Sequence, residues 1–347
     1  MPKASITESS IVMNSLPGIA NLSVDDWKKL GTAHILLTGG TGFFGSWIIA
    51  SFLELRKMGF PIELTVLSRD PDRFLEKNPG LKNHAGLAFR KGDVKSATIP
   101  FSISHIVHLA TSDRDAGNTA VEGTRHMLNE AKRVGAVRFL LASSGAVYSS
   151  ADGGRGSAGG AAESSYVAGQ AASVFGLTPL GKAKREAESL CHQASTARDI
   201  ETVVARGFTF CGPLFPTEGP YAISIFMHAM LNGLPLPVKT PDSVRSFLDG
   251  RDLATALWKI LGTGKNGEAY NVGSAECVTM SELADITRSV AWKASLRVPE
   301  IRRPAVGVVP VADVYRPSIV KLQTELGWSQ AISLRESLLA QAKWALE

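Results

Sequence analysis

The chain has 347 residues, of which 44% are hydrophobic and 20% charged, and its formal net charge is +5. This is enough to bury a core as one large α/β unit or as a domain with a smaller lobe. The basic residues form no Lys/Arg block, which argues against nucleic-acid binding.

The cysteines and the apolar pattern indicate which metal sites and membrane segments to expect. The three cysteines, Cys191, Cys211 and Cys277, lie far apart and match no metal-ligand spacing, so we expect no metal and a reduced, cytoplasmic setting. We expect no membrane span, because no apolar run is long enough to cross a bilayer. The N-terminus lacks the basic and apolar pattern of a signal peptide.

Residues 1–30 are predicted to form an N-terminal extension that precedes the main domain. The pattern around Trp27 and Leu30 indicates a short helix. We expect this helix to pack on the domain, with a role at a subunit contact as the alternative.

A glycine-rich turn follows the first strand signal. The apolar run 34–37 leads into Thr38-Gly39-Gly40-Thr41-Gly42-Phe43-Phe44-Gly45, and an apolar-periodic helix begins there. In a strand–turn–helix unit of this kind, Gly39 permits the tight turn and Gly42 lets backbone N–H groups approach a pyrophosphate. Gly45 lets the helix pack against the strand, and the helix N-terminus attracts phosphate. The sequence therefore predicts a dinucleotide site here, against the alternative of a glycine turn without a ligand.

Strand and helix signals then alternate along the chain. Alternation of this kind predicts a parallel, doubly wound α/β sheet, whose ligands lie beyond the carboxyl ends of the strands. His108, in one of these strands, is predicted to be a packed core histidine. The predicted strands cover 62–67, 88–90, 106–109, 139–142 and 202–205, and the clearest helices cover 118–134, 181–197 and 223–231.

The segment 149–177 interrupts this alternation. It is rich in Gly, Ala and Ser, which gives it little to bury, so we expect a flexible insertion. A disordered surface loop and a lid over the site are equally good interpretations.

The Gly-x-x-Gly-x-x-Gly spacing and the later motifs 141–148, 206–213 and 245–254 resemble the short-chain dehydrogenase/reductase superfamily, in its extended branch of nucleotide-sugar epimerases, dehydratases and reductases. The resemblance implies a Rossmann domain over 31–210 and a smaller, mainly substrate-binding lobe over 211–347, of which about 245–275 returns to the Rossmann core. It also implies an NAD(P)-dependent enzyme that modifies a nucleotide-diphosphate sugar, as an epimerase, a ketoreductase or an unusual dehydratase.

The cofactor choice rests on the end of the second strand. Ser68 stands where NAD-preferring domains carry an acidic residue, and Arg69 follows it, which favours NADP(H). NAD(H) is the alternative, since Asp70 is one position further on. Asp93 resembles the family's contact with the adenine. The predicted cofactor-binding residues are Gly39, Thr41, Gly42, Phe43, Phe44, Gly45, Ser68, Arg69, Asp93, Val94, Leu109, Ala110, Thr111, Ser143 and Lys184.

The resemblance also identifies catalytic residues. Ser144 takes the place of the family's catalytic serine or threonine, whose hydroxyl bonds the reacting sugar oxygen. Gly145 and Ala146 stand where the 4,6-dehydratases carry an Asp-Glu pair, which argues against conventional dehydration. Lys184 matches the lysine of the family's Tyr-x-x-x-Lys motif, but Leu180 replaces the tyrosine.

A leucine cannot move a proton, and three hypotheses remain. Another group acts, the candidates being Tyr148, Tyr166, Glu163, Lys182 and Cys211; or Ser144, water or the substrate suffices; or the protein binds its ligands without turnover, as a scaffold or regulator. The swap nearly preserves size, so fold and cofactor binding should survive it.

The remaining candidates concern the substrate and the assembly. Thr209 falls where many relatives have an asparagine that contacts the sugar diphosphate. Arg245 resembles the family arginine that pairs with substrate phosphate, with a surface ion pair as the alternative. Arg316 is a weaker substrate candidate. By resemblance, the helices over 118–134 and 181–197 would pair two subunits into a homodimer through a four-helix bundle.

Overall fold

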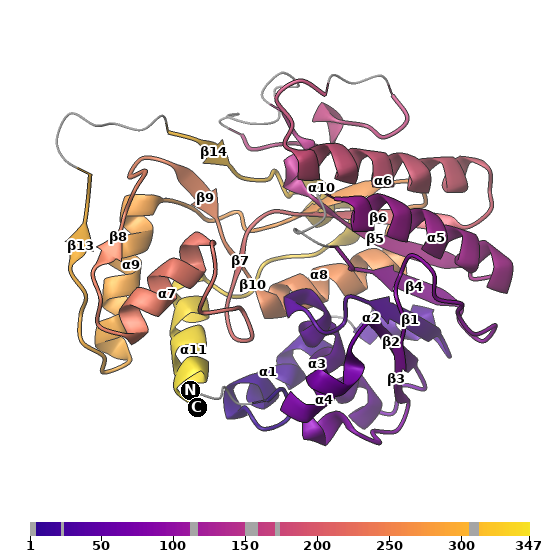
Figure 1. Cartoon of the computed structure of the whole chain (residues 1–347), viewed down its shortest axis with the longest axis horizontal. Helices are drawn as coiled ribbons and strands as arrows, with labels where there is room; N and C mark the ends of the chain where they lie inside the picture. Colours follow the sequence, from indigo (N-terminus) through magenta and orange to yellow (C-terminus); the bar gives the residue numbers. More distant parts are fainter. Residues whose placement is uncertain (1–4, 22–23, 112–116, 150–158, 171–173, 305–311) are drawn as a thin grey trace.

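The computed structural model describes residues 5–21, 24–111, 117–149, 159–170, 174–304 and 312–347. Its centre is a seven-stranded parallel sheet in the order β11-β6-β5-β4-β1-β2-β3 (Figure 1). The strands are β1 (His34–Thr38), β2 (Glu63–Ser68), β3 (Leu87–Lys91), β4 (His105–His108), β5 (Arg138–Ser144), β6 (Glu201–Gly207) and β11 (Ala269–Val272). The predicted doubly wound α/β fold is confirmed.

Both faces of the sheet are buried under helices. Side chains alternate along a strand, so Ile35 and Leu37 enter one core cluster while Leu36 enters the other. The first cluster lies under α1 (Ser10–Asn21), α2 (Val24–Leu30), α3 (Phe43–Lys57) and α8 (Gly250–Thr263), and the second under α5 (Asn118–Val134) and α6 (Pro179–Thr196). The short helix α4 (Pro71–Lys77) lies beside β3.

The N-terminal residues are part of the core. Trp27, on the predicted short helix, is fully buried and packs edge-on against Trp258 with ring centroids 4.4 Å apart. At the other end of the chain, the Glu347 carboxylate accepts hydrogen bonds from Ser9 and Ser10.

The smaller lobe lies beside the sheet and is built from short strand pairs and helices (Figure 1). β7 (Phe210–Cys211) pairs with β10 (Leu248–Asp249), β8 (Leu236–Pro237) pairs with β13 (Ile301–Arg302), and β9 (Val244–Ser246) lies between β12 (Cys277–Thr279) and β14 (Val314–Tyr315). The helices of this half are α7 (Ala222–Leu231), α9 (Met280–Lys293) and α11 (Leu334–Leu346), whereas α10 (Val320–Leu326) packs against β11 and α8 of the sheet half. None of the helices described is both long and apolar enough to cross a membrane.

The described part of 149–177 is packed around Ala161 and Tyr166, whereas Val174 and Phe175 expose 55% and 81% of their surface. Ala161 and Tyr166 expose 2% and 5% of their surface. Ala161 forms a β-bridge with Pro317 and accepts a hydrogen bond from Asn271 Nδ2, 2.8 Å away. Residues 150–158 and 171–173 lie outside the described residues.

Candidate active site

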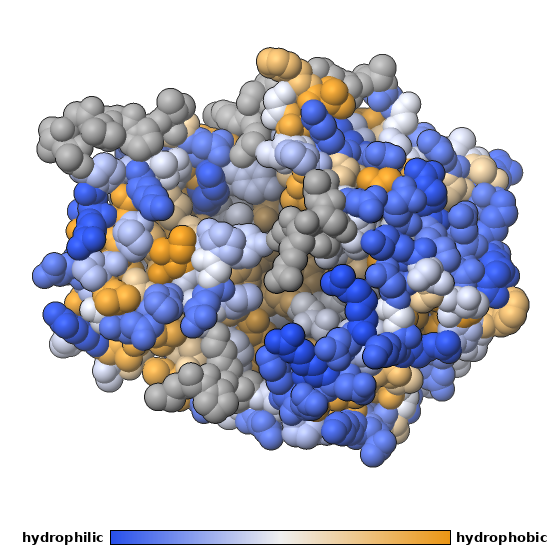
Figure 2. All heavy atoms as spheres, in the orientation of Figure 1, coloured by the Kyte–Doolittle hydropathy of each residue, from blue (hydrophilic) through white to orange (hydrophobic). Residues whose placement is uncertain are grey.

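A cleft of about 1140 Å³ runs from the carboxyl ends of the sheet strands to the smaller lobe. Figure 2 shows the surface hollowed between these two halves. Almost all predicted cofactor residues line the cleft, as do Ser144, Leu180, Thr209 and Arg245. The topology thus brings together segments that are more than 200 residues apart in the sequence.

The glycine turn is shaped for close backbone approach. Gly39 has a left-handed backbone (φ 69°), and an added Cβ would come within 2.8 Å of the Ala110 nitrogen. Gly45 does not line the cleft; its Cβ would come 2.3 Å from the Gly40 Cα, so glycine is needed for the helix to pack on the turn.

Gly42 differs from Gly39 and Gly45 because packing does not require it to be glycine. An added Cβ would meet only the Gly39 carbonyl oxygen, at an ordinary 3.4 Å. Gly42 caps α3 and lines the cleft, and the first N–H groups of a helix have no intrahelical acceptor. The turn therefore fits the pyrophosphate of a dinucleotide.

The residues after β2 and β3 form the far end of the cleft. Arg69 is exposed and lines the cleft. Asp70 caps α4 by accepting the Arg73 N–H at 3.2 Å, so this carboxylate is already in use. Asp93 lines the cleft and also accepts the Lys95 N–H at 2.9 Å.

Ser144 ends β5 and begins a 3₁₀ turn over 145–147. Its hydroxyl accepts the Ala146 N–H at 3.1 Å and can still donate to an oxygen in the cleft. Lys184 reaches the same end of β5 from α6, where its Nζ donates to the Ala142 carbonyl at 2.7 Å. Leu180 lies one helical turn before Lys184 and also lines the cleft.

A buried polar network lies next to Ser144. Ser143 donates to the Glu188 carboxylate, which pairs with Arg206. Arg206 in turn donates to the Tyr148 hydroxyl, and Tyr148 donates to Asn271 Oδ1, each at 2.8 Å. These bonds fix the position of β5 and β6 below the cleft.

The structure places the five candidate replacements for the missing tyrosine outside the cleft lining. Tyr148 is held in the buried network, where burial raises its pKa. Tyr166 donates to the Arg185 carbonyl, Glu163 accepts the Asn271 N–H, and Lys182 is exposed. The burial of these side chains could not be predicted from local sequence patterns, because it depends on tertiary packing.

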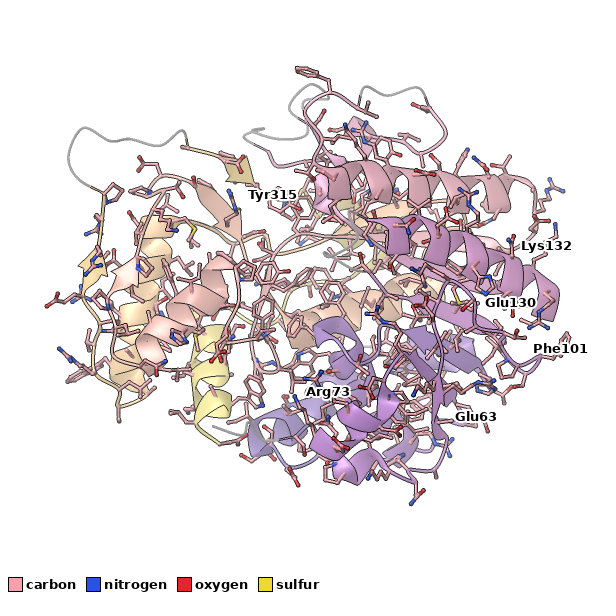
Figure 3. The ribbon with its side chains drawn as sticks, in the orientation of Figure 1. Glu63, Arg73, Phe101, Glu130, Lys132 and Tyr315 are labelled. Atoms are coloured by element: carbon pink, nitrogen blue, oxygen red, sulfur yellow. The ribbon has the colours of Figure 1, made fainter. Side chains whose placement is uncertain are left out.

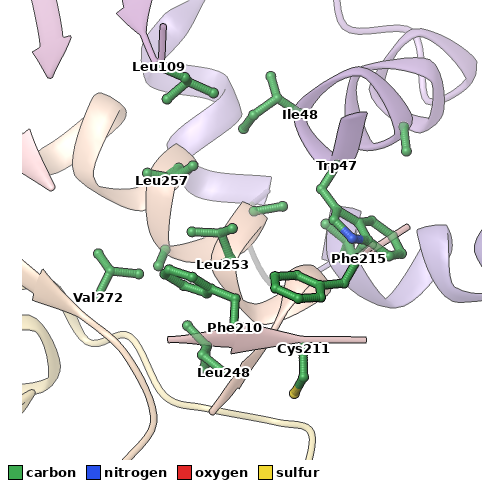
Figure 4. Close-up of a cluster of buried hydrophobic side chains, with 14 of the residues drawn as sticks. Trp47, Ile48, Leu109, Phe210, Cys211, Phe215, Leu248, Leu253, Leu257 and Val272 are labelled. Carbon is green, nitrogen blue, oxygen red and sulfur yellow. The ribbon is translucent and has the colours of Figure 1, made fainter. Parts of the chain in front are cut away.

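Cys211 is also unsuited to proton exchange in the cleft. Its sulfur contacts the Ser337 hydroxyl at 3.0 Å, and burial raises the pKa of the thiol. Figure 4 shows the sulfur on the side of β7 opposite the Phe210 ring.

Of the three predicted substrate-binding residues, two line the cleft and one does not. Thr209 lines the cleft, and its hydroxyl donates to the Ser246 carbonyl. Arg245 also lines the cleft, but its guanidinium pairs with Asp313 at 2.9 Å and is one quarter exposed. Arg316 does not line the cleft. Among the described residues, no cluster of His, Cys, Asp and Glu side chains could hold a metal ion.

This arrangement of a doubly wound sheet, a glycine turn and a cleft reaching a second lobe is typical of dinucleotide-binding proteins. Residues 35–273 match the model of the NAD dependent epimerase/dehydratase family, and the chain belongs to this family.

Individual relatives share less than 30% of their residues with this chain. UDP-glucuronic acid decarboxylase 5 of Arabidopsis thaliana is 28% identical over 328 residues, which cover 88% of this chain and 87% of the relative. A dTDP-glucose 4,6-dehydratase of Streptomyces griseus is 26% identical over 333 residues, 90% of this chain and 94% of the relative.

Among solved structures, the dTDP-glucose 4,6-dehydratase of Streptomyces venezuelae, with NAD and TYD bound, superposes with a TM-score of 0.72. The two chains are 22% identical, and the match covers 90% of this chain and 96% of the other. At this identity the likeness shows the fold.

Proposed function

We propose that this protein is an NAD(P)-dependent enzyme that transfers hydride at a ring carbon of a nucleotide-diphosphate sugar. The observation that carries the proposal is the single cleft that joins the glycine turn at 39–45 to Ser144, Lys184 and Arg245. Relatives named for reactions of UDP and dTDP sugars support this substrate class.

Each group in the cleft has a role in this chemistry. When bound, the nicotinamide would accept or return the hydride. The glycine turn would hold the pyrophosphate, and the Lys184 ammonium would bind the nicotinamide ribose. The Ser144 hydroxyl would donate to the reacting sugar oxygen, and Arg245 would bind the sugar diphosphate.

The residues after Ser144 bear on the reaction type. Elimination needs a proton donor and acceptor, and Gly145 and Ala146 supply neither. Epimerisation, ketone reduction and the decarboxylation of a uronic acid proceed through an oxidised or reduced ring carbon without such a pair. We therefore favour these outcomes over 4,6-dehydration.

We further propose that NADP(H) is preferred to NAD(H). The Arg69 guanidinium lies at the cleft and has no ion-pair partner among the described residues, whereas Asp70 is occupied as a helix cap. Arginine suits a 2′-phosphate because its planar fork bonds two phosphate oxygens.

Leu180 carries the second candidate function, a protein that binds cofactor and sugar nucleotide without turnover. Its aliphatic side chain lines the cleft where the family tyrosine would stand. Ser144, Lys184 and Arg245 weigh against this candidate, since a scaffold needs none of them at the cleft.

We also propose a homodimer through α5 and α6. The exposed residues of these helices include charged ones, with Arg125 placed 3.8 Å from Glu122 and 3.6 Å from Glu186. Light scattering coupled to gel filtration would show a dimer, which Arg125→Glu would weaken.

Proton NMR in heavy water tests the main proposal. UDP-glucose, UDP-glucuronic acid and dTDP-glucose are each incubated with the protein and with NADP(H) or NAD(H). Deuterium uptake, a new anomeric signal or a reduced product identifies an enzyme and its reacting carbon. Unchanged sugars, alongside measurable cofactor binding, support the second candidate if Leu180→Tyr is also inactive.

A further inference from the structure

Few groups in the cleft can exchange a proton. The cleft lining contains the phenols of Tyr221 and Tyr315 and the ammonium groups of Lys184 and the exposed Lys239, and Asp93 supplies its one carboxylate among the described residues. Asp93 lies at the cofactor end and caps a turn. Tyr221 is half exposed at the beginning of α7.

Tyr315 comes from the far end of the chain but lies next to the residues after β5. It belongs to β14, where it pairs in register with Arg245 of β9. Figure 3 shows Tyr315 where the smaller lobe meets the sheet half. A Cβ built on Gly145 would come within 2.6 Å of the Tyr315 hydroxyl oxygen. The phenol therefore ends beside the residue that follows Ser144.

The ring of Tyr315 is held by its neighbours. Its centroid lies 5.0 Å from that of Phe208, which stacks on Tyr148 at 6.0 Å. The Arg245 guanidinium carbon lies 5.8 Å from the Tyr315 centroid. The same guanidinium pairs with Asp313 at 2.9 Å, so Arg245 and Asp313 together form one side of the space around the ring.

We propose that Tyr315 is the catalytic acid/base that takes the role of the tyrosine replaced by Leu180. The assignment rests on the proposed function. In the oxidative direction, the sugar O–H bond breaks and its proton passes to the Tyr315 phenolate. The carbon would release hydride to an oxidised nicotinamide, when that cofactor is bound, which leaves a carbonyl. The reductive direction returns the proton from the phenol to the carbonyl oxygen as the hydride adds to carbon.

The position of the Tyr315 phenol depends on the absence of a side chain at Gly145. Where the 4,6-dehydratases that this chain resembles carry an acidic pair, this chain has no side chain at position 145, and the phenol occupies the space that the Cβ would take. An acidic side chain there and the phenol in its present place exclude one another. The glycine therefore gives Tyr315 access to the reacting oxygen.

Turnover is the first test, with Tyr315→Phe compared to Tyr270→Phe, which removes a phenolic hydroxyl outside the cleft lining. We expect Tyr315→Phe to lower turnover of the nucleotide sugar by about a hundredfold or more, the usual contribution of a general acid or base. Tyr270→Phe should change it less than about threefold. Equal turnover by the two variants overturns the assignment.

Gly145→Ala is a second, independent variant. Its methyl group would displace the phenol of Tyr315 and the Phe208 ring, so we expect turnover to fall at least about tenfold. Gly18→Ala, where an added Cβ meets no atom within 4 Å, is the control for the same substitution. Unchanged turnover in Gly145→Ala, with the protein folded, contradicts the assignment.

Ligand affinity supplies a readout that does not require turnover. Calorimetry with NADPH, or NADH, bound compares UDP-glucose with its 4-deoxy analogue. If C4 is the reacting carbon, we expect the wild type to prefer UDP-glucose, and Tyr315→Phe to lower this preference by roughly threefold to tenfold, as for one hydrogen bond. Ser144 would keep the remainder, and an unchanged preference in Tyr315→Phe overturns the Tyr315 contact. A wild type that binds but never turns over any sugar overturns the proposed function instead, and the catalytic assignment with it.

Discussion

The carboxylate of Glu188 and the guanidinium of Arg206 form an ion pair, 2.7 Å apart, in which neither side chain exposes more than 1% of its surface. The pair links α6 to β6 and contacts Ser143 directly. A charge at such a depth needs its partner, because an unpaired ion is strongly destabilised away from water. The floor of the cleft therefore depends on both residues together.

Replacing Glu188 should destabilise the protein. We expect Glu188→Gln to lower the free energy of unfolding by about 3–5 kcal/mol, because it leaves Arg206 buried without a counter-charge. Urea denaturation measures the change. Glu186→Gln, two residues away on the exposed side of the same helix, should change it by less than about 0.5 kcal/mol. Similar values for the two variants would contradict a central role for the pair.

Lys184 provides a direct test of turnover against ligand binding alone. In an enzyme, Lys184→Ala should lower turnover at least about a hundredfold, because the ammonium group at the cleft is lost. In a silent binding protein the same change should only weaken cofactor binding. Lys182→Ala, on the exposed side of α6, is the matched control. Turnover and cofactor Kd are measured on all three proteins, and wild-type turnover in Lys184→Ala would remove this residue from the mechanism.

Cofactor preference should follow Arg69. We expect Arg69→Ala to raise the Kd of NADPH by about tenfold to a hundredfold, as for a charge-assisted bond to phosphate, and to leave that of NADH within about twofold. Fluorescence titration with each reduced cofactor gives both constants. Arg73→Ala, on α4 outside the cleft lining, serves as the control. Equal losses for NADPH and NADH would indicate that Arg69 binds no 2′-phosphate.

The stability of the fold should depend on pH through His108. Burial, and then the charge of Lys184, lowers the pKa of His108 from 6.5 to about 3. Between these values the unfolded chain takes up a proton that the folded protein does not. Stability from this residue is therefore fully present above pH 6.5 and falls by about 1.4 kcal/mol per pH unit as the pH drops toward 3.

His108→Gln isolates this contribution. Glutamine can keep a hydrogen bond to Thr38, which contacts His108 Nδ1 at 2.8 Å, but it does not titrate. Chemical denaturation between pH 7.5 and 5 should show a shallower pH dependence for the variant. Parallel curves for the two proteins would mean that His108 does not cause the acid sensitivity.

Local signals in the sequence predict six of the seven strands of the sheet, and β11 is the strand that they miss. The predicted runs stand apart from their flanking helices, and those at 62–67 and 202–205 lie within a residue or two of β2 and β6. The glycine turn is equally local, because one strand, one turn and one helix contain all of it. His108 is the buried core residue that the sequence predicts.

Contacts between distant segments could not be predicted in this way. Arg245 meets Asp313 from 68 positions away, and Tyr315 reaches Gly145 across 170 positions. Nothing near Tyr315 in the sequence marks it as chemically active, whereas Tyr148 stands beside Ser144 in sequence and is nevertheless sealed into the core. Proximity along the chain was thus a poor guide to proximity in the cleft.

The position of β14 in the chain also has a consequence for synthesis on the ribosome. Once residue 207 has been added, six of the seven strands of the central sheet have been made, together with the glycine turn, Ser144 and Lys184. The partner of Arg245 and the phenol beside Gly145 follow only with residues 313–315. A nascent chain therefore contains its dinucleotide-type half long before it acquires the last walls of the cleft.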